Sequence, residues 1–100
     1  MTARKIDLPI EDIILFCKRN QVKELAVFGS YLRDDFRPDS DIDFLVEFVP
    51  GVEIGYLTFT RMERELSAIL HKKVDLVPKA GLKTQIRAQV LRESQVLYAS

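Results

Sequence analysis

The sequence predicts an α+β fold, in which a small mixed β-sheet carries flanking helices. Segments whose apolar residues recur at helical spacing alternate with short apolar runs of strand length. One hundred residues are enough to build one continuous hydrophobic core, but not two. The chain contains no internal repeat, low-complexity segment or linker, so we expect residues 1–100 to form a single domain.

Each expected element ends at residues that cannot easily continue it. Gly29-Ser30 stops the first strand with a residue free to turn and one able to begin a short helix, and Pro50-Gly51 turns the chain after the second strand. Asp7 can cap the first helix. The expected elements, in order, are a helix over residues 8–19, a strand over 25–28, a short helix from residue 30, a polar loop over 34–41, a strand over 42–48, a helix over 58–70, a strand over 74–77, a helix over 82–93 and a strand over 96–98.

Composition excludes several classes of function. Fifteen basic and fifteen acidic residues cancel, so the chain lacks the positive field that drives general nucleic-acid binding. No apolar run approaches a membrane span, and Glu11 and Asp12 interrupt the first apolar stretch where a signal peptide would need it. A single cysteine, Cys17, can form neither an internal disulfide nor a zinc site and is expected to be a buried thiol. We therefore expect a cytoplasmic protein with no membrane contact.

Three carboxylates form the most informative pattern. Asp41 and Asp43 straddle Ile42 at the start of the second strand, so both side chains point to one face about 6.6 Å apart. Asp75 lies inside the apolar run of the third strand, where a buried carboxylate would need a partner. If the third strand lies beside the second, the three acids can bind two hard cations.

Two alternatives compete with that interpretation. In the first, Asp39 and Asp41 merely cap the loop and Asp75 points to solvent from an edge strand. The alternate spacing of Asp39, Asp41 and Asp43 also matches the start of a calcium-binding EF-hand loop. Counted from Asp39, however, the sixth position is Phe44 rather than glycine and the twelfth is not glutamate, so a calcium loop is excluded.

The turn after the first strand suits a phosphate. Gly29-Ser30 supplies a close backbone approach, a hydroxyl and the amides at the start of a short helix. Arg33, one helical turn later, could add a charge-assisted contact to the same phosphate. A strand followed by Gly-Ser is by itself also compatible with an ordinary turn, so its weight comes from the acids that follow.

These motifs together resemble the minimal nucleotidyltransferase (MNT) family of the polymerase-beta-type superfamily, over the whole chain. The family usually has a glycine after the arginine, where this chain has Asp34. The resemblance implies a nucleotidyltransferase fold. It also implies nucleotide-binding roles for Gly29, Ser30, Arg33 and Ser40, and catalytic and magnesium-binding roles, for two Mg²⁺ ions, for Asp41, Asp43 and Asp75.

The resemblance further implies transfer of AMP from ATP to a hydroxyl. MNT proteins resemble the antitoxin half of toxin–antitoxin pairs whose toxin is a helical HEPN ribonuclease, so the expected acceptor is a tyrosine on a HEPN partner and the expected assembly a hetero-oligomer. One alternative is an antitoxin that neutralises its partner by binding alone. Another is an enzyme acting on a small molecule or an RNA end.

Two surface groups are candidates for partner contact. The first is aromatic and apolar, before and within the long helix: Tyr56, Leu57 and Phe59. The second is a basic row around the last helix: Lys79, Lys83 and Arg87. The alternative is that the first group completes the core and the second is a solvated face.

Overall fold

The computed structural model describes residues 8–32 and 41–100. Helices and strands alternate along these two segments as the sequence pattern predicts. The elements, in order, are α1 (Ile10–Arg19), β1 (Val22–Phe28), the 3-10 turn η1 (Gly29–Leu32), β2 (Ile42–Phe48), α2 (Tyr56–Leu70), β3 (Val74–Pro78), the 3-10 turn η2 (Lys79–Gly81), α3 (Thr84–Glu93) and β4 (Gln95–Ala99).

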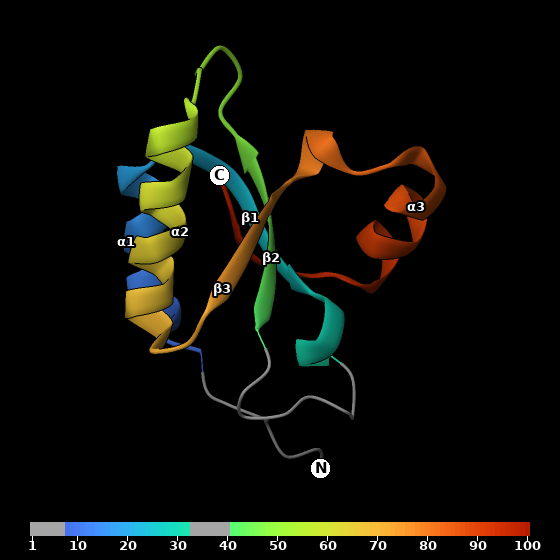
Figure 1. Ribbon diagram of the computed structural model, residues 1–100, viewed down its shortest axis with the longest axis horizontal. Coiled ribbons are helices and arrows are strands. Elements are labelled where there is room, and N and C mark those ends of the chain that lie inside the picture. Colours follow the sequence, from blue (N-terminus) through green and yellow to red (C-terminus); the bar gives the residue numbers. More distant parts are fainter. Residues whose placement is uncertain (1–7, 33–40) are drawn as a thin grey trace.

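The four strands form one sheet in the order β3-β2-β1-β4. β1 pairs with β2 and with β4 in antiparallel fashion, whereas β2 and β3 run parallel and are connected through α2. Figure 1 shows the sheet in the middle of the molecule, with α1 and α2 side by side on one face. The mixed sheet with flanking helices is the predicted α+β architecture.

The two faces of the sheet differ in how they are covered. Along β2, Ile42, Phe44 and Val46 belong to the hydrophobic core under α1 and α2. Because side chains alternate along a strand, Asp43 and Glu47 point to the opposite face. α3 lies on that side of the sheet (Figure 1) and buries none of its residues. The acids of β2 therefore lie on the less covered face.

Several element boundaries differ from the sequence prediction. α1 begins at Ile10 with Pro9 in the N-cap position, and the predicted cap Asp7 lies outside the described residues. β1 begins three residues earlier than predicted, at Val22, because that residue is buried and pairs with Phe48 of β2. α2 begins at Tyr56, and η2 was not predicted. These boundaries depend on contacts between elements, which periodicity does not report.

The core confirms the prediction for the single thiol. Cys17 is fully buried between the last turn of α1 and the sheet, and burial raises the pKa of its thiol to about 12. The thiol is therefore uncharged at neutral pH and serves as an apolar core group. Among the described helices, none is both long and apolar enough to cross a lipid bilayer.

Candidate active site

The turn after β1 is packed against a carboxylate of the neighbouring strand. Gly29 has a φ of 77°, in the region that favours glycine. A Cβ placed on Gly29 would lie 2.4 Å from Oδ2 of Asp43, closer than non-bonded atoms can approach. Glycine is therefore required here twice, by the backbone conformation and by the space that the Asp43 carboxylate occupies.

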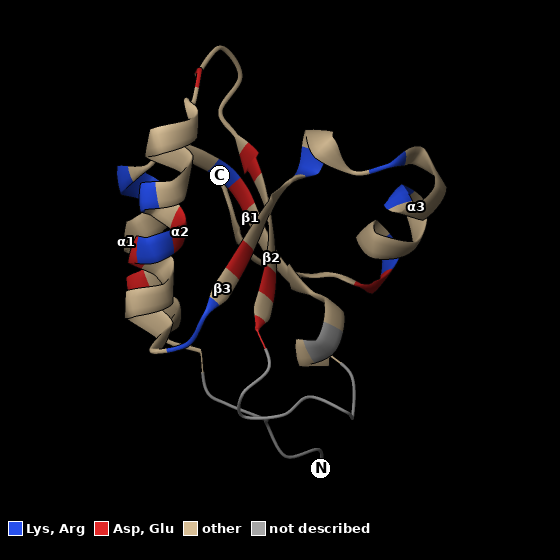
Figure 2. Ribbon diagram, in the orientation of Figure 1, with Lys and Arg blue, Asp and Glu red and all other residues tan. Residues whose placement is uncertain are grey.

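Strand register brings two of the predicted acids to neighbouring positions. In the parallel pairing of β2 with β3, Asp43 lies opposite Asp75. Their chain neighbours Phe44 and Leu76 are buried in the core, so both carboxylates leave the sheet on its other face. Figure 2 shows the acidic positions of β2 and β3 beside each other at this end of the sheet. The prediction that the third strand lies beside the second is confirmed.

Asp75 is exposed rather than buried. It lies on β3, which is an edge strand of the sheet. The expectation that this carboxylate is desolvated is therefore wrong, and the alternative, that it faces solvent from an edge strand, is confirmed. An exposed carboxylate needs no buried partner and can contact a molecule that approaches from solvent.

Asp41, the third predicted ligand, directly precedes β2 and makes an ion pair with a lysine. Lys73 Nζ lies 3.9 Å from Asp41 Oδ2, and the two side chains are 80% and 46% exposed. The amide of Ile42 donates to the carbonyl of Lys73 at 3.0 Å, which fixes the two chain segments next to each other. Lys73 was not among the site residues predicted from the sequence. Its position directly before β3, two residues before Asp75, could have identified it.

The donor set is chemically suited to magnesium, which prefers carboxylate oxygens. Gly29 has no side chain, and the Asp43 carboxylate occupies the space that a side chain would fill. A carboxylate packed against the turn in this way fits a magnesium site. In the conformation described, however, no group of three or more His, Cys, Asp or Glu side chains within residues 8–32 and 41–100 is arranged to hold a metal ion. One joint magnesium site for Asp41, Asp43 and Asp75 stays a prediction.

Part of the predicted nucleotide site lies outside the described structure. Arg33, Asp34 and Ser40 lie outside the described residues. The backbone of Ser30 lies in η1, but its side chain is likewise not described. The described part of the predicted phosphate site is therefore the Gly29 turn.

The two groups proposed for partner contact are only partly available. Phe59 packs against Phe48, with ring centroids 6.5 Å apart in an edge-on arrangement, whereas Tyr56 and Leu57 are 79% and 80% exposed. Tyr56 and Leu57 lie at the opposite end of the sheet from Asp43. Asp43 is near the start of β2, and α2 begins beyond the other end of that strand (Figure 1).

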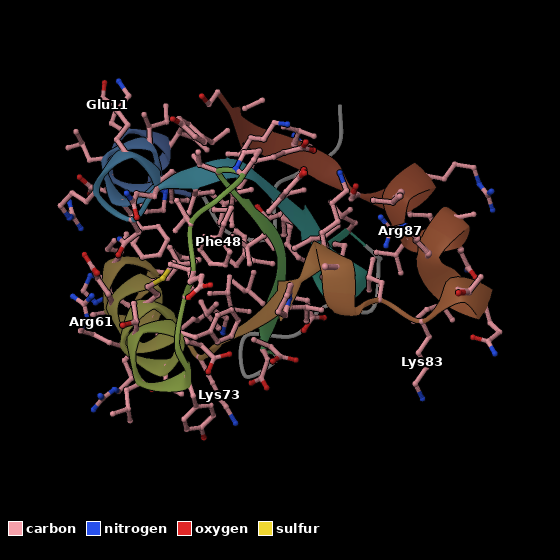
Figure 3. The ribbon with its side chains drawn as sticks, turned by 90° about the horizontal axis from the view of Figure 1, so that it is seen from above. Glu11, Phe48, Arg61, Lys73, Lys83 and Arg87 are labelled. Atoms are coloured by element: carbon pink, nitrogen blue, oxygen red, sulfur yellow. The ribbon has the colours of Figure 1, made fainter. Side chains whose placement is uncertain are left out.

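The basic row does not form one helix face. Lys79 lies in η2, before α3, and its ammonium makes ion pairs with Glu24 at 3.8 Å and Glu47 at 3.4 Å. Arg87 donates to the carbonyl of Lys79 at 3.2 Å, and Lys83 points away from the sheet (Figure 3). The prediction of an exposed row of three is therefore wrong for Lys79, because the sheet surface below it carries two acids.

Comparison with known proteins agrees with the geometry. Residues 10–97 match the model of the nucleotidyltransferase domain family. The protein adenylyltransferase MntA of Thermococcus cleftensis is 45% identical over 78 residues, which cover 76% of this chain and 75% of the relative. A solved structure described as a minimal nucleotidyltransferase superposes with a TM-score of 0.73 at 35% identity, over 92% of this chain and 97% of that one.

A third match places the fold in a complex. One chain of a tri-AMPylated Shewanella oneidensis HEPN toxin in complex with an MNT antitoxin superposes with a TM-score of 0.68 at 22% identity, over 91% of this chain and 70% of that one. At this identity the likeness shows the fold alone. The family match spans residues 10–97, nearly the whole chain: the chain belongs to the nucleotidyltransferase domain family.

Proposed function

We propose that this chain is a magnesium-dependent protein adenylyltransferase that transfers AMP from ATP to a tyrosine hydroxyl of a HEPN toxin, and thereby acts as its antitoxin in the cytoplasm. One observation carries the proposal: the Gly29 turn packs against the carboxylate of Asp43, with Asp75 opposite on the next strand. A phosphate-binding turn beside paired acids is the arrangement that nucleotidyl transfer needs. The relatives that are themselves named protein adenylyltransferases support the choice of AMP and of a protein acceptor.

At the α-phosphorus of ATP, the reaction forms one bond and breaks one. The acceptor oxygen bonds to the α-phosphorus of ATP, and the bond from that phosphorus to its bridging oxygen breaks, so that pyrophosphate leaves with the electron pair. The acceptor hydroxyl must lose its proton. Asp75 is exposed on the face of the sheet that carries Asp43, and a carboxylate in that place can accept this proton.

The remaining site residues hold the nucleotide. The backbone at Gly29-Ser30 would bind the phosphates, with Arg33 and Ser40 as further contacts. Asp41, Asp43 and Asp75 would hold magnesium, which when bound neutralises phosphate charge and orients the reacting oxygens. Asp41 must then exchange its ion pair with Lys73 for the metal.

The acceptor must reach the face of the sheet that carries Asp43 and Asp75. We propose that the toxin covers this face, beside α3. The described part of the chain leaves α3 with no buried residue, and exposes Ile86 at 45% and Val96 at 50%. An isolated helix of ten residues is marginally stable in water, so packing by a partner would stabilise α3. The toxin in complex with an MNT antitoxin supports this assembly.

The test is transfer of AMP to the co-expressed partner, followed by intact mass. Asp43→Asn keeps the side-chain volume but removes the charge, so we expect it to abolish transfer while the protein stays folded. Asp12→Asn, an exposed acid in the first turn of α1, is the matched control and should transfer normally. Magnesium with a non-hydrolysable ATP analogue should also raise the melting temperature of the wild type, through binding linkage.

Transfer by Asp43→Asn at saturating magnesium and ATP would refute the site. If the wild-type complex suppresses toxicity without adding AMP to the partner, the chain is an antitoxin that acts by binding alone. If the purified chain modifies a small molecule or an RNA end without any protein partner, the acceptor proposed here is wrong.

A further inference from the structure

Asp75 lies on a strand that has a strand neighbour on one side only. β3 is the edge of the sheet, next to β2. Along a strand, successive residues direct their backbone amides to opposite sides. The carbonyl of Lys73 accepts from Ile42 of β2, so residues 73, 75 and 77 turn their backbone groups toward β2. The amides of Val74 and Leu76 therefore point outward, away from the sheet.

Side chains of α2 bind both outward amides. Val74 N donates to Ser67 Oγ at 3.0 Å, and Leu76 N donates to Glu63 Oε2 at 2.8 Å. The Ser67 hydroxyl in turn donates to the carbonyl of Glu63 at 2.9 Å, so its position is held as well. The next outward position is Pro78, which has no amide hydrogen. Each outward amide position from 74 to 78 is thus accounted for.

The spacing of the two acceptors matches that of the two amides. Ser67 and Glu63 are four residues apart on α2, which is about 6 Å along a helix. Val74 and Leu76 are two residues apart on β3, which is about 6.6 Å along a strand. The two acceptors on α2 are therefore spaced as the hydrogen-bonding groups of a neighbouring strand would be. Asp75 lies between the two amides that they bind.

We infer that Glu63 and Ser67 are positioning residues of the active site, which fix Asp75 opposite Asp43 by holding the outer edge of β3. This inference rests on the proposed role of Asp75 in the reaction. A strand bonded on one side only can fray or shift its register, and a shift by two residues would place Lys73 or Val77 opposite Asp43. The two acceptors on α2 oppose both movements.

The experiment compares two substitutions at one position. Glu63→Gln keeps an acceptor oxygen and removes the charge, whereas Glu63→Leu removes the acceptor. Glu65→Leu, on the same helix, removes a glutamate that pairs with Arg19 and does not bond β3, and is the matched control. Two quantities are measured on the full chain: the affinity for AMP-PNP with magnesium, by calorimetry, and the hydrogen-exchange rate of the Leu76 amide, by NMR.

We expect Glu63→Leu to weaken magnesium-dependent AMP-PNP binding by about tenfold or more, as is usual for residues that orient metal ligands. The Leu76 amide should exchange at least about tenfold faster, because its bond is lost. Glu63→Gln should stay within about twofold of the wild type in both quantities, and Glu65→Leu should leave both unchanged. Ser67→Ala is a milder change and should accelerate hydrogen exchange of the Val74 amide. This variant replaces Glu63→Leu in the comparison if Glu63→Leu does not fold.

Two results would overturn the inference. One is wild-type affinity and wild-type exchange in Glu63→Leu. The other is a loss in Glu63→Gln as large as that in Glu63→Leu, which would assign the effect to charge rather than to the hydrogen bond. If the wild type itself fails to bind AMP-PNP with magnesium, the proposed function is wrong, while the exchange rates still report whether α2 holds the edge of β3.

Discussion

Gly29→Ala separates the conformational role of this glycine from its role beside the acids. Alanine at a φ of 77° adopts a left-handed conformation, which costs about 1–2 kcal/mol. The added Cβ would also lie 2.4 Å from Asp43 Oδ2, so the carboxylate must move. That movement displaces a group proposed to bind magnesium.

Two other glycines provide matched controls. Gly51 has a φ of 88° and nothing within 4 Å of an added Cβ, so Gly51→Ala has the same conformational cost without the clash. Gly55 has a φ of −75° and the same free space, but it is the N-cap of α2, where alanine is less favourable than glycine, so Gly55→Ala should cost about 0.5–1 kcal/mol without any strain in φ. For a domain of this size, about 1–2 kcal/mol corresponds to a fall in melting temperature of about 4–16 °C. We expect that fall in Gly29→Ala and Gly51→Ala, and a smaller one in Gly55→Ala.

Binding distinguishes the first two variants. The assay is calorimetric titration with AMP-PNP and magnesium at a temperature well below the melting transitions. Gly51→Ala should bind as the wild type does, whereas Gly29→Ala should lose most of its affinity. Equal affinity in the two alanine variants would refute the argument that the space at Gly29 exists for the Asp43 carboxylate.

Two further predictions concern a surface pair and a core thiol. Lys73→Met should change the free energy of unfolding by less than about 1 kcal/mol, because its pair with Asp41 is exposed. The same variant should bind magnesium a few-fold more tightly in a calorimetric titration, since a competing cation is gone; weaker binding would contradict this. For Cys17, burial raises the pKa of the thiol from 9.0 to about 12, so between these pH values the unfolded chain loses its proton and the folded chain keeps it. Stability should therefore fall with rising pH by up to about 1.4 kcal/mol per pH unit from this group, and Cys17→Ala should lack that component in urea titrations; identical slopes in the two proteins would disprove it.

Some of the site could be predicted because it depends on local geometry. The alternation of side chains along β2 places Asp43 on the face opposite the core residues Ile42 and Phe44, whereas Asp41 directly precedes the strand. The Gly29 turn follows from a residue without a side chain at the end of a buried strand. Both conclusions use distances of a few residues along one chain segment, which the sequence states directly.

Other predictions were wrong because they depended on which element lies beside which. An apolar run around Asp75 suggested a buried carboxylate, but the side chain leaves this edge strand on the face of the sheet opposite the core under α1 and α2, where it is exposed. Lys79 was grouped with a helix by its spacing, yet it lies in η2 above Glu24 and Glu47. In both cases burial and pairing are decided by neighbours that are distant in sequence.

The sequence by itself determined the order of the main helices and strands, the face on which Asp43 leaves its strand and the glycine that ends β1, because each follows from the pattern of a single segment. Only the tertiary structure decided that Asp75 lies opposite Asp43, that the Asp43 carboxylate occupies the space at Gly29, and that α2 binds the edge of β3. The physical reason is that strand register and the contact of a helix with a strand edge are set by the packing of the whole core, to which every element contributes.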